Sequence, residues 1–240
     1  MNKPLFMRGL KAGIPIALGY FSVSIAFGLQ AVAPDCGLHP LQALLISLTN
    51  LTSAGQLAGI QVIAASGTLF EMGLTQLTIN LRYALMSLIL TQKLDGSMGT
   101  LQRLIFSFGN TDEIFAVAAS EPGTLNKHYL YGLMTLPYLG WGLGTLVGAV
   151  AGTLLPTFVQ TALGIALYGM FLAVVLPASR KERPVCVVAI IAALLSIAFR
   201  YLPFLRDVPG GYVIIICAVA ASCAGAVLFP VKDEDGKEGA

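Results

Sequence analysis

One arginine and one asparagine interrupt the apolar segment Thr75-Gln76-Leu77-Thr78-Ile79-Asn80-Leu81-Arg82-Tyr83-Ala84-Leu85-Met86. Apolar sequence extends on both sides of the arginine, from Met72 to Leu90. An arginine at the centre of a membrane-spanning helix costs about 2.5–3.5 kcal/mol on insertion scales, so an unpaired Arg82 facing lipid is unfavourable. We therefore expect Arg82 to face a protein interior or a wet cavity, and to have a partner.

The composition of the whole chain is that of a membrane protein. Of its 240 residues 56% are hydrophobic and only 11% are charged, whereas soluble domains carry about 25% charged residues. The apolar segments predict an all-α integral membrane protein, a polytopic helical bundle with six to eight transmembrane segments. Three positive charges, Lys3, Arg8 and Lys11, precede the first segment and predict a cytoplasmic N-terminus.

The second apolar segment, 41–67, has a polar centre at Thr49-Asn50-Leu51-Thr52-Ser53-Ala54-Gly55-Gln56. One interpretation is a continuous helix whose hydroxyl groups bond back to its own carbonyls and whose small residues pack. The other is a broken or re-entrant helix that exposes backbone groups to a substrate. Such backbone is tolerated at membrane depth only where it is buried or lines a cavity. Asn50 and Gln56 are then candidate contact residues.

The third segment, 72–92, contains Arg82 and has two polar faces. One face carries Gln76, Asn80, Tyr83 and Ser87, and the other carries Thr75, Thr78 and Arg82. Two polar faces leave little surface for lipid, so this helix is predicted to lie in the middle of the bundle.

The fourth segment, 101–120, carries both basic and acidic residues, among them Arg103, Asp112 and Glu113. It is interpreted either as an interfacial helix, or as a helix broken at Gly109 with Thr111 or Asp112 capping the next helix. The functional alternative is a buried acidic pair beside Arg82, because carboxylates inside a membrane are candidate proton or cation sites. We favour the acidic pair, since it supplies the partner that Arg82 requires.

A stretch without charge, 129–179, is long enough for two crossings with a turn at Pro156. Its first crossing carries a glycine at every fourth position, namely Gly140, Gly144, Gly148 and Gly152. Such spacing lets another helix approach closely, either within the chain or from a partner subunit. Trp141 and Tyr138 are expected to pack there or to line a cavity.

The organisation predicted for the chain is a single transmembrane domain, 1–231, and a disordered cytoplasmic tail, 232–240. Pro15, placed in the first turn of its helix, resembles Pro137, which favours a weak internal repeat of 12–120 and 129–231. Eight crossings put both termini in the cytoplasm but leave Lys93 and Arg103 outside. Six crossings, with segment two re-entrant and segment four in the membrane plane, put these two inside as well. Charge counting is compatible with both arrangements.

Other classes of function lack support in the sequence. The four cysteines show no metal-ligand spacing and the two histidines lie far apart. There is no nucleophile–base set and no glycine-rich phosphate loop. We therefore predict no enzyme activity, no metal and no cofactor.

Several motifs together resemble the AzlC family of bacterial branched-chain amino-acid permeases, over roughly residues 9–229. They are Gly13-Ile14-Pro15, Phe27-Gly28, Ser53-Ala54-Gly55-Gln56, Asn80-Leu81-Arg82-Tyr83, Thr111-Asp112-Glu113-Ile114-Phe115-Ala116, Trp141-Gly142-Leu143-Gly144-Thr145 and Met170-Phe171. The chain departs from the family pattern at Tyr83, where histidine is frequent. It also lacks an acid near Gly164.

The resemblance implies a subunit of a bacterial inner-membrane transporter that exports branched-chain amino acids with a small hydrophobic AzlD-type partner, and the charge distribution predicts that both termini are cytoplasmic. Arg82 is then expected to bind the substrate carboxylate or to pair with Asp112 or Glu113. One of these acids would meet the substrate ammonium or carry a coupling proton. Neutral hydrogen bonds would come from Asn50, Gln56 and Asn80, with Tyr83 beside them. The alternatives are a membrane assembly or scaffold protein with a purely structural polar core, and a transporter of another small solute.

Overall fold

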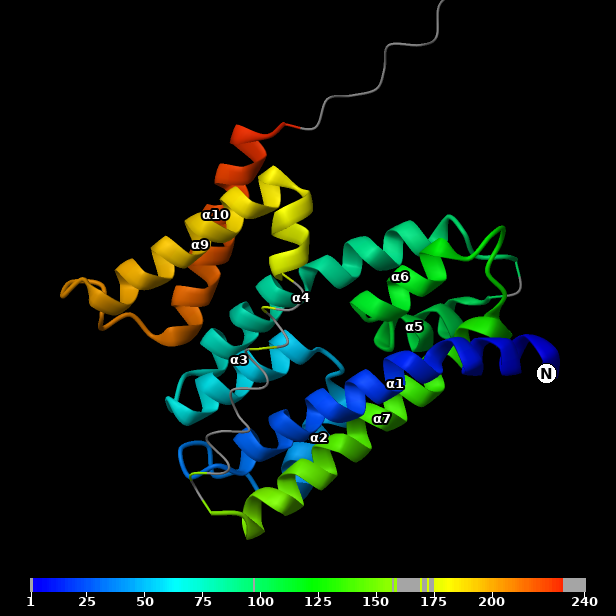
Figure 1. Ribbon diagram of the computed structural model, residues 1–240, viewed down its shortest axis with the longest axis horizontal. Coiled ribbons are helices and arrows are strands. Elements are labelled where there is room, and N and C mark those ends of the chain that lie inside the picture. Colours follow the sequence, from blue (N-terminus) through cyan, green and yellow to red (C-terminus); the bar gives the residue numbers. More distant parts are fainter. Residues whose placement is uncertain are drawn as a thin grey trace, which may run out of the picture. The chain divides into compact units, whose positions relative to one another are not determined.

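The computed structural model describes residues 2–96, 98–156, 158, 169, 172 and 175–230. They form helices joined by short loops, with one isolated bridge between Leu94 and Leu125 (Figure 1). The chain divides into two compact units, Met1–Tyr168 and Gly169–Ala240. The helices of the first unit are α1 (Lys3–Val32), α2 (Pro40–Thr49), α3 (Ser53–Ala64), α4 (Leu69–Thr91), α5 (Thr100–Phe108), α6 (Asp112–Ser120) and α7 (Lys127–Leu154).

Within the described part of the chain, four helices are long and apolar enough to cross a membrane, by length and composition. They are α1 and α7 in the first unit and, in the second, α9 (Arg183–Tyr201) and α10 (Gly210–Leu228). The structure therefore confirms a helical, polytopic membrane protein.

Helices α1 and α7 form the axis of the first unit and run parallel to each other (Figure 1). Gly9 near the start of α1 lies against Tyr129 near the start of α7, and Gly148 near the end of α7 lies against Ile25. A Cβ added at Gly148 would overlap the carbonyl oxygen of Ile25. The glycine-bearing face of α7 thus packs against α1 of the same chain. Backbone atoms of α1 lie close to Gly140, Gly144, Gly148 and Gly152.

Proline positions differ from the prediction. Pro15 was expected in the first turn, but α1 begins at Lys3 and Pro15 lies inside it, as Pro137 lies inside α7. A proline inside a helix leaves the carbonyl four residues earlier without its usual donor. For Pro137 that carbonyl belongs to Leu133, and its oxygen lies against the Cα face of Gly13 on α1. The close approach of the two helices covers this carbonyl.

Segment two is broken, as one of the two interpretations required. Helix α2 ends at Thr49, residues 50–52 are extended or irregular, and α3 begins at Ser53. The hydroxyl of Tyr138, halfway along α7, donates a hydrogen bond of 3.0 Å to the Leu48 carbonyl at the end of α2. Further along α3, the carbonyl of Ile60 accepts from the Cys36 thiol, which follows the end of α1. The chain therefore goes from the C-terminal end of α1 to mid-depth and returns to the same end.

Segment four makes the corresponding excursion from the opposite end. Helix α5 ends at Phe108, and α6 begins at Asp112 after a break at residues 109–111. The two ends of this excursion are tied together, because Asp95 and Leu125 are joined by a backbone hydrogen bond of 3.0 Å. At its turning point, Thr111 lies 2.6 Å from the hydroxyl of Tyr20, in the middle of α1.

Segments 40–64 and 100–120 are therefore two re-entrant hairpins that enter from opposite ends of the α1–α7 pair. Each hairpin turns back halfway along the α1–α7 pair, which favours the six-crossing arrangement over the eight-crossing one. Of the alternatives for segment four, the structure shows the break after Gly109 and the ion pair of Asp112 with Arg82. Lys93 and Arg103 then lie at the same end as Lys3 and Arg8, as the rule of cytoplasmic positive charge favours.

Among the described helices of the first unit, α4 contacts mainly α3 and α6. One of its polar faces meets these neighbours, whereas its leucines are exposed, among them Leu77, Leu81, Leu85 and Leu88. Within the first unit, the polar residues on α4 thus mark its contacts with the two hairpins.

The second unit contains the helical pair α9 and α10, where Gly225 lies against Val188. These helices match predicted segments 185–199 and 211–231 to within three residues at each end. Most of the predicted crossing after Pro156, and the predicted tail 232–240, lie outside the described residues. The single domain and the internal repeat stay predictions.

Candidate functional site

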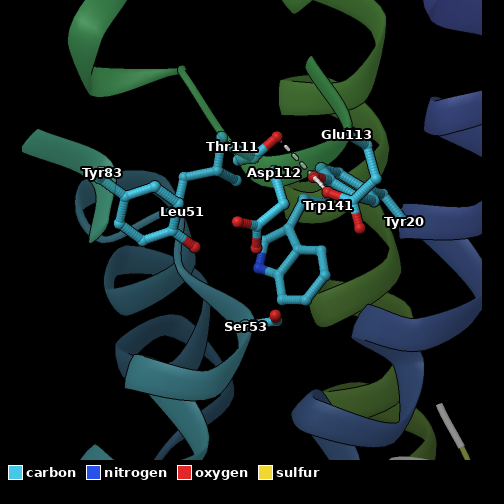
Figure 2. Close-up of a pocket in the computed structure, with 8 residues that line it drawn as sticks. All are labelled: Tyr20, Leu51, Ser53, Tyr83, Thr111, Asp112, Glu113 and Trp141. Atoms are coloured by element: carbon cyan, nitrogen blue, oxygen red, sulfur yellow. Dashed lines mark hydrogen bonds between the residues drawn. The ribbon is translucent and has the colours of Figure 1, made fainter. Parts of the chain in front are cut away.

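The breaks in the two re-entrant hairpins meet at one polar pocket, halfway along α1 and α7 (Figure 2). The α2–α3 break contributes Leu51 and Ser53, and the α5–α6 break contributes Thr111 and the first residues of α6. The complete lining is Tyr20, Leu51, Ser53, Tyr83, Thr111, Asp112, Glu113 and Trp141. The cavity has a volume of about 10 Å³, which is room for roughly one water molecule.

An ion pair lies at the mouth of this pocket. Arg82 Nη2 of α4 is 2.9 Å from Asp112 Oδ2 of α6, and the two side chains are 46% and 43% exposed. The same Nη2 donates to the Tyr83 hydroxyl at 3.2 Å, and the guanidinium lies over the Tyr83 ring, 4.9 Å from its centroid. The requirement of Arg82 for a partner is thus met by Asp112, which starts a helix, where a negative charge is favourable.

The second acid of α6 is held by α1. The Tyr20 hydroxyl donates to Glu113 and lies 2.6 Å from the Thr111 hydroxyl. The Tyr20 ring meets Trp141 of α7 edge to face, with centroids 5.2 Å apart and planes at 79°. Trp141 is 2% exposed, and its indole nitrogen has no hydrogen-bond partner among the described residues.

A second polar group lies on the other side of the α2–α3 break and centres on Gln76 of α4. Gln76 Nε2 donates to the Gly55 carbonyl at 2.7 Å. This contact fixes the orientation of the amide, because a carbonyl can only accept. Gln76 Oε1 then accepts from Asn80 at 3.1 Å and from Asn50 at 3.5 Å. These amides join the broken segment to α4.

Gln56 belongs to a separate buried chain of hydrogen bonds. Its Nε2 donates to the Ser47 hydroxyl at 2.8 Å, and Ser47 shares a bond of 2.7 Å with the Thr145 hydroxyl. All three residues are at most 1% exposed. The chain connects α3, α2 and α7 behind the break.

An apolar pocket of about 230 Å³ lies among α2, α3 and α4. Its surface is mostly apolar, and its side-chain amides come from the broken segment and from Gln76. The lining residues are Ile46, Thr49, Asn50, Gly55, Gln56, Gly59, Ile60, Ile63, Met72 and Gln76. An engineered apolar cavity of about 150 Å³ binds benzene, so this pocket has room for an aliphatic side chain.

The structure brings together some of the residues singled out from the sequence and separates others. Tyr83, Asp112 and Glu113 line the polar pocket, with Arg82 at its mouth. Two others, Asn50 and Gln56, line the apolar pocket. Asn80 contacts Gln76 beside it. Groups of three or more metal-ligating side chains do not occur in the described part of the chain.

Sequence reasoning did not single out Tyr20, Ser53 and Thr111 as site residues, and it left Trp141 between packing and cavity lining. The available signal was that Ser53 and Thr111 each stand beside a break. Tyr20 carried no signal, because its partners lie more than 90 positions away in the chain.

Comparisons with known proteins place the chain in a family. The sequence model described as AzlC protein matches residues 15–155. Inner membrane protein YgaZ of Escherichia coli (strain K12) is 27% identical over 231 residues, covering 93% of this chain and 90% of that protein. An uncharacterized membrane protein of Archaeoglobus fulgidus is 32% identical over 175 residues, which are 72% of this chain and 75% of that protein. No solved structure matches. Since the family model covers more than half of the sequence, the chain belongs to the AzlC family of membrane proteins.

Proposed function

We propose that the protein is the large subunit of an inner-membrane exporter of amino acids with branched apolar side chains, working with a small AzlD-type membrane subunit. The observation that carries this proposal is the meeting of two broken hairpins at a polar pocket in mid-depth. Irregular backbone at membrane depth is tolerated where it is buried or lines a cavity, and transporters use such breaks to bind substrates.

Charge at the pocket fits a zwitterion. Asp112 and Glu113 offer two carboxylates at the first turn of α6, and ionisable groups inside a membrane are expensive unless they serve a site. One of them meets the substrate ammonium or carries a coupling proton. Arg82 holds Asp112 in place at the pocket mouth.

The apolar pocket supports the apolar side chain of the substrate. Gly55 and Gln56, in the first turns of α3, line this pocket, while Ser53 of the same helix lines the polar one. A substrate bound at the start of α3 therefore has polar groups on one side and aliphatic side chains on the other. Asn50 and Gln56 supply neutral polar contacts, and Asn80 supports them through Gln76.

The test is efflux from cells preloaded with a leucine-containing dipeptide, with the chain alone, with an AzlD-type partner, and with matched variants. Leucine, isoleucine and valine are expected to leave faster with the partnered wild type, and Arg82→Gln to abolish the gain. The control is Arg103→Gln in the same unit, because Arg103 bonds only the Met98 carbonyl among the contacts described for it and is absent from the pocket lining.

Two outcomes would redirect the assignment. Absence of efflux with folded, partnered protein would favour another solute or the scaffold alternative. Equal export by Arg82→Gln and wild type would remove Arg82 from the site.

A further inference from the structure

The start of α3 is a helix N-terminus at the polar pocket, where Ser53 is part of the lining. Its first turn contains no acidic residue, and Thr52 before it makes no side-chain hydrogen bond to that turn. The first backbone N–H groups of a helix have no acceptor within the helix, and the helix dipole favours a negative charge there. The start of α6, which faces the same pocket, differs because Asp112 and Glu113 supply that charge.

The unpaired indole N–H of Trp141 is a second, independent indication that the polar pocket binds a hydrogen-bond acceptor. Trp141 lines the same pocket as Ser53, is 2% exposed, and its indole N–H has no partner among the described residues. Figure 2 shows the indole nitrogen on the side of the ring that faces the Asp112 carboxylate, with the Ser53 hydroxyl nearby. The edge contact with Tyr20 holds the ring in this orientation. Buried polar groups in proteins are normally paired, so an unpaired one at a pocket indicates a ligand or a water.

We propose that the substrate carboxylate binds at the N-terminus of α3, where it accepts hydrogen bonds from the Trp141 indole N–H, the Ser53 hydroxyl and the first backbone amides of α3. This inference rests on the proposed function, since it names the group that orients the exported amino acid. The substrate ammonium then lies toward Asp112 and Glu113. Trp141, and not Arg82, is the residue that recognises the carboxylate.

The contacts of Arg82 support this division of roles. Its Nη2 is shared between Asp112 and the Tyr83 hydroxyl, so the positive charge of Arg82 is already paired with a carboxylate of the protein. In the conformation described, the cavity has room for about one water molecule. An amino acid therefore enters by separation of the exposed Arg82–Asp112 pair at the mouth. Arg82 acts as a positioning and gating residue.

Trp141 is the only tryptophan in the chain, so its fluorescence reports on this position alone. The purified full-length protein is titrated with leucine, with isocaproate, which lacks the amino group, and with leucinol, which lacks the carboxylate. Leucine and isocaproate are expected to change the tryptophan emission, whereas leucinol requires a concentration about tenfold higher or more, as loss of hydrogen bonds to a charged group predicts. Leucinol acting as well as leucine would overturn the proposal.

Export by variants gives a second measurement that does not depend on fluorescence. Trp141→Phe keeps a ring against Tyr20 but removes the N–H. The leucine concentration that gives half-maximal export is expected to rise about tenfold, and the protein is expected to lose its preference for leucine over leucinol. Tyr131→Phe, which loses a hydroxyl contact elsewhere on α7, is the control and is expected to keep both. Protein amount and thermal unfolding are compared in each case.

The arms of these experiments separate the two proposals. If Arg82→Gln erases the preference for leucine while Trp141→Phe retains it, the carboxylate binds Arg82 and this inference is wrong, although the exporter stands. If the partnered wild type exports no amino acid, the proposed function is wrong. In that case, a change in Trp141 fluorescence with isocaproate but not with leucinol would still support a carboxylate site. The lack of any change in fluorescence would overturn the carboxylate site.

Discussion

Arg82 and Asp112 form an ion pair whose side chains are nearly half exposed, so its contribution to stability is small, roughly 0–1 kcal/mol. We predict that Arg82→Gln and Asp112→Asn each reduce export at least about tenfold while changing the free energy of unfolding by less than about 1 kcal/mol. Export in preloaded cells and thermal unfolding of purified protein check the two parts. Variants whose loss of export only follows a loss of folded protein would assign the pair a structural role.

The buried chain of Gln56, Ser47 and Thr145 is predicted to matter for stability instead. Thr145→Val keeps the shape of the side chain but leaves Ser47 with one partner fewer, which costs about 1–3 kcal/mol for a buried polar group. Thr153→Val on the same helix is the control, because the Thr153 hydroxyl bonds only within its own helix and the residue is exposed. Equal unfolding midpoints for the two variants would show that these buried hydrogen bonds contribute nothing measurable to stability.

Single residues differed in how far the sequence could predict them. A partner for Arg82 followed from the cost of an unpaired charge in lipid, and the acids of segment four were the nearest candidates. Tyr20 and Trp141 depend on the adjacency of α1, α6 and α7, and no local pattern contains that information. The sequence left Trp141 between packing and cavity lining, and its unpaired indole N–H is a property of the folded chain only.

Between helices, the close contact of α1 and α7 depends on the absence of side chains at a few positions. A Cβ at Gly148 overlaps the Ile25 carbonyl oxygen, and backbone cannot rotate away as a side chain can. We predict that Gly148→Ala lowers stability by about 1–3 kcal/mol, as overpacking does. Gly19→Ala is the control, because nothing lies within 4 Å of a Cβ added at Gly19. Thermal unfolding of both variants is the measurement, and equal destabilisation would contradict the close contact.

Helix breaks were among the structures that the sequence allowed, but the direction of the chain after each break could not be predicted. Clusters of polar residues and glycine at residues 49–56 and 109–112 made a break one of the interpretations of each segment, and both breaks occur. The periodicity of apolar residues does not show whether the chain continues across the membrane after a break or turns back to the side from which it came. The return of α3 depends on contacts such as Cys36 with Ile60, which only the folded unit contains.

For the molecule as a whole, the two hairpins determine which loops lie on the same side of the membrane. With a cytoplasmic N-terminus, the loop between α3 and α4 lies outside and the loop between α4 and α5 lies inside, the reverse of an eight-crossing chain. After replacement of the four native cysteines, Ser66→Cys is expected to react with an impermeant maleimide added to intact cells, and Gly96→Cys only after permeabilisation. Both positions are exposed, and the opposite labelling would restore eight crossings.

The parallel pairing of α1 with α7 also has a consequence for biosynthesis. The contacting positions, such as Gly9 and Tyr129, are separated by about 120 residues, and at 5–20 residues per second the ribosome needs roughly 6–24 s to make them. During that time α1 waits in the bilayer with its glycines uncovered, and both hairpins are made before α7 is available to support them. The yield of folded protein would therefore depend on a chaperone or insertase that shields α1 during this interval. Slower translation after residue 33 would lengthen the time for which α1 needs this protection.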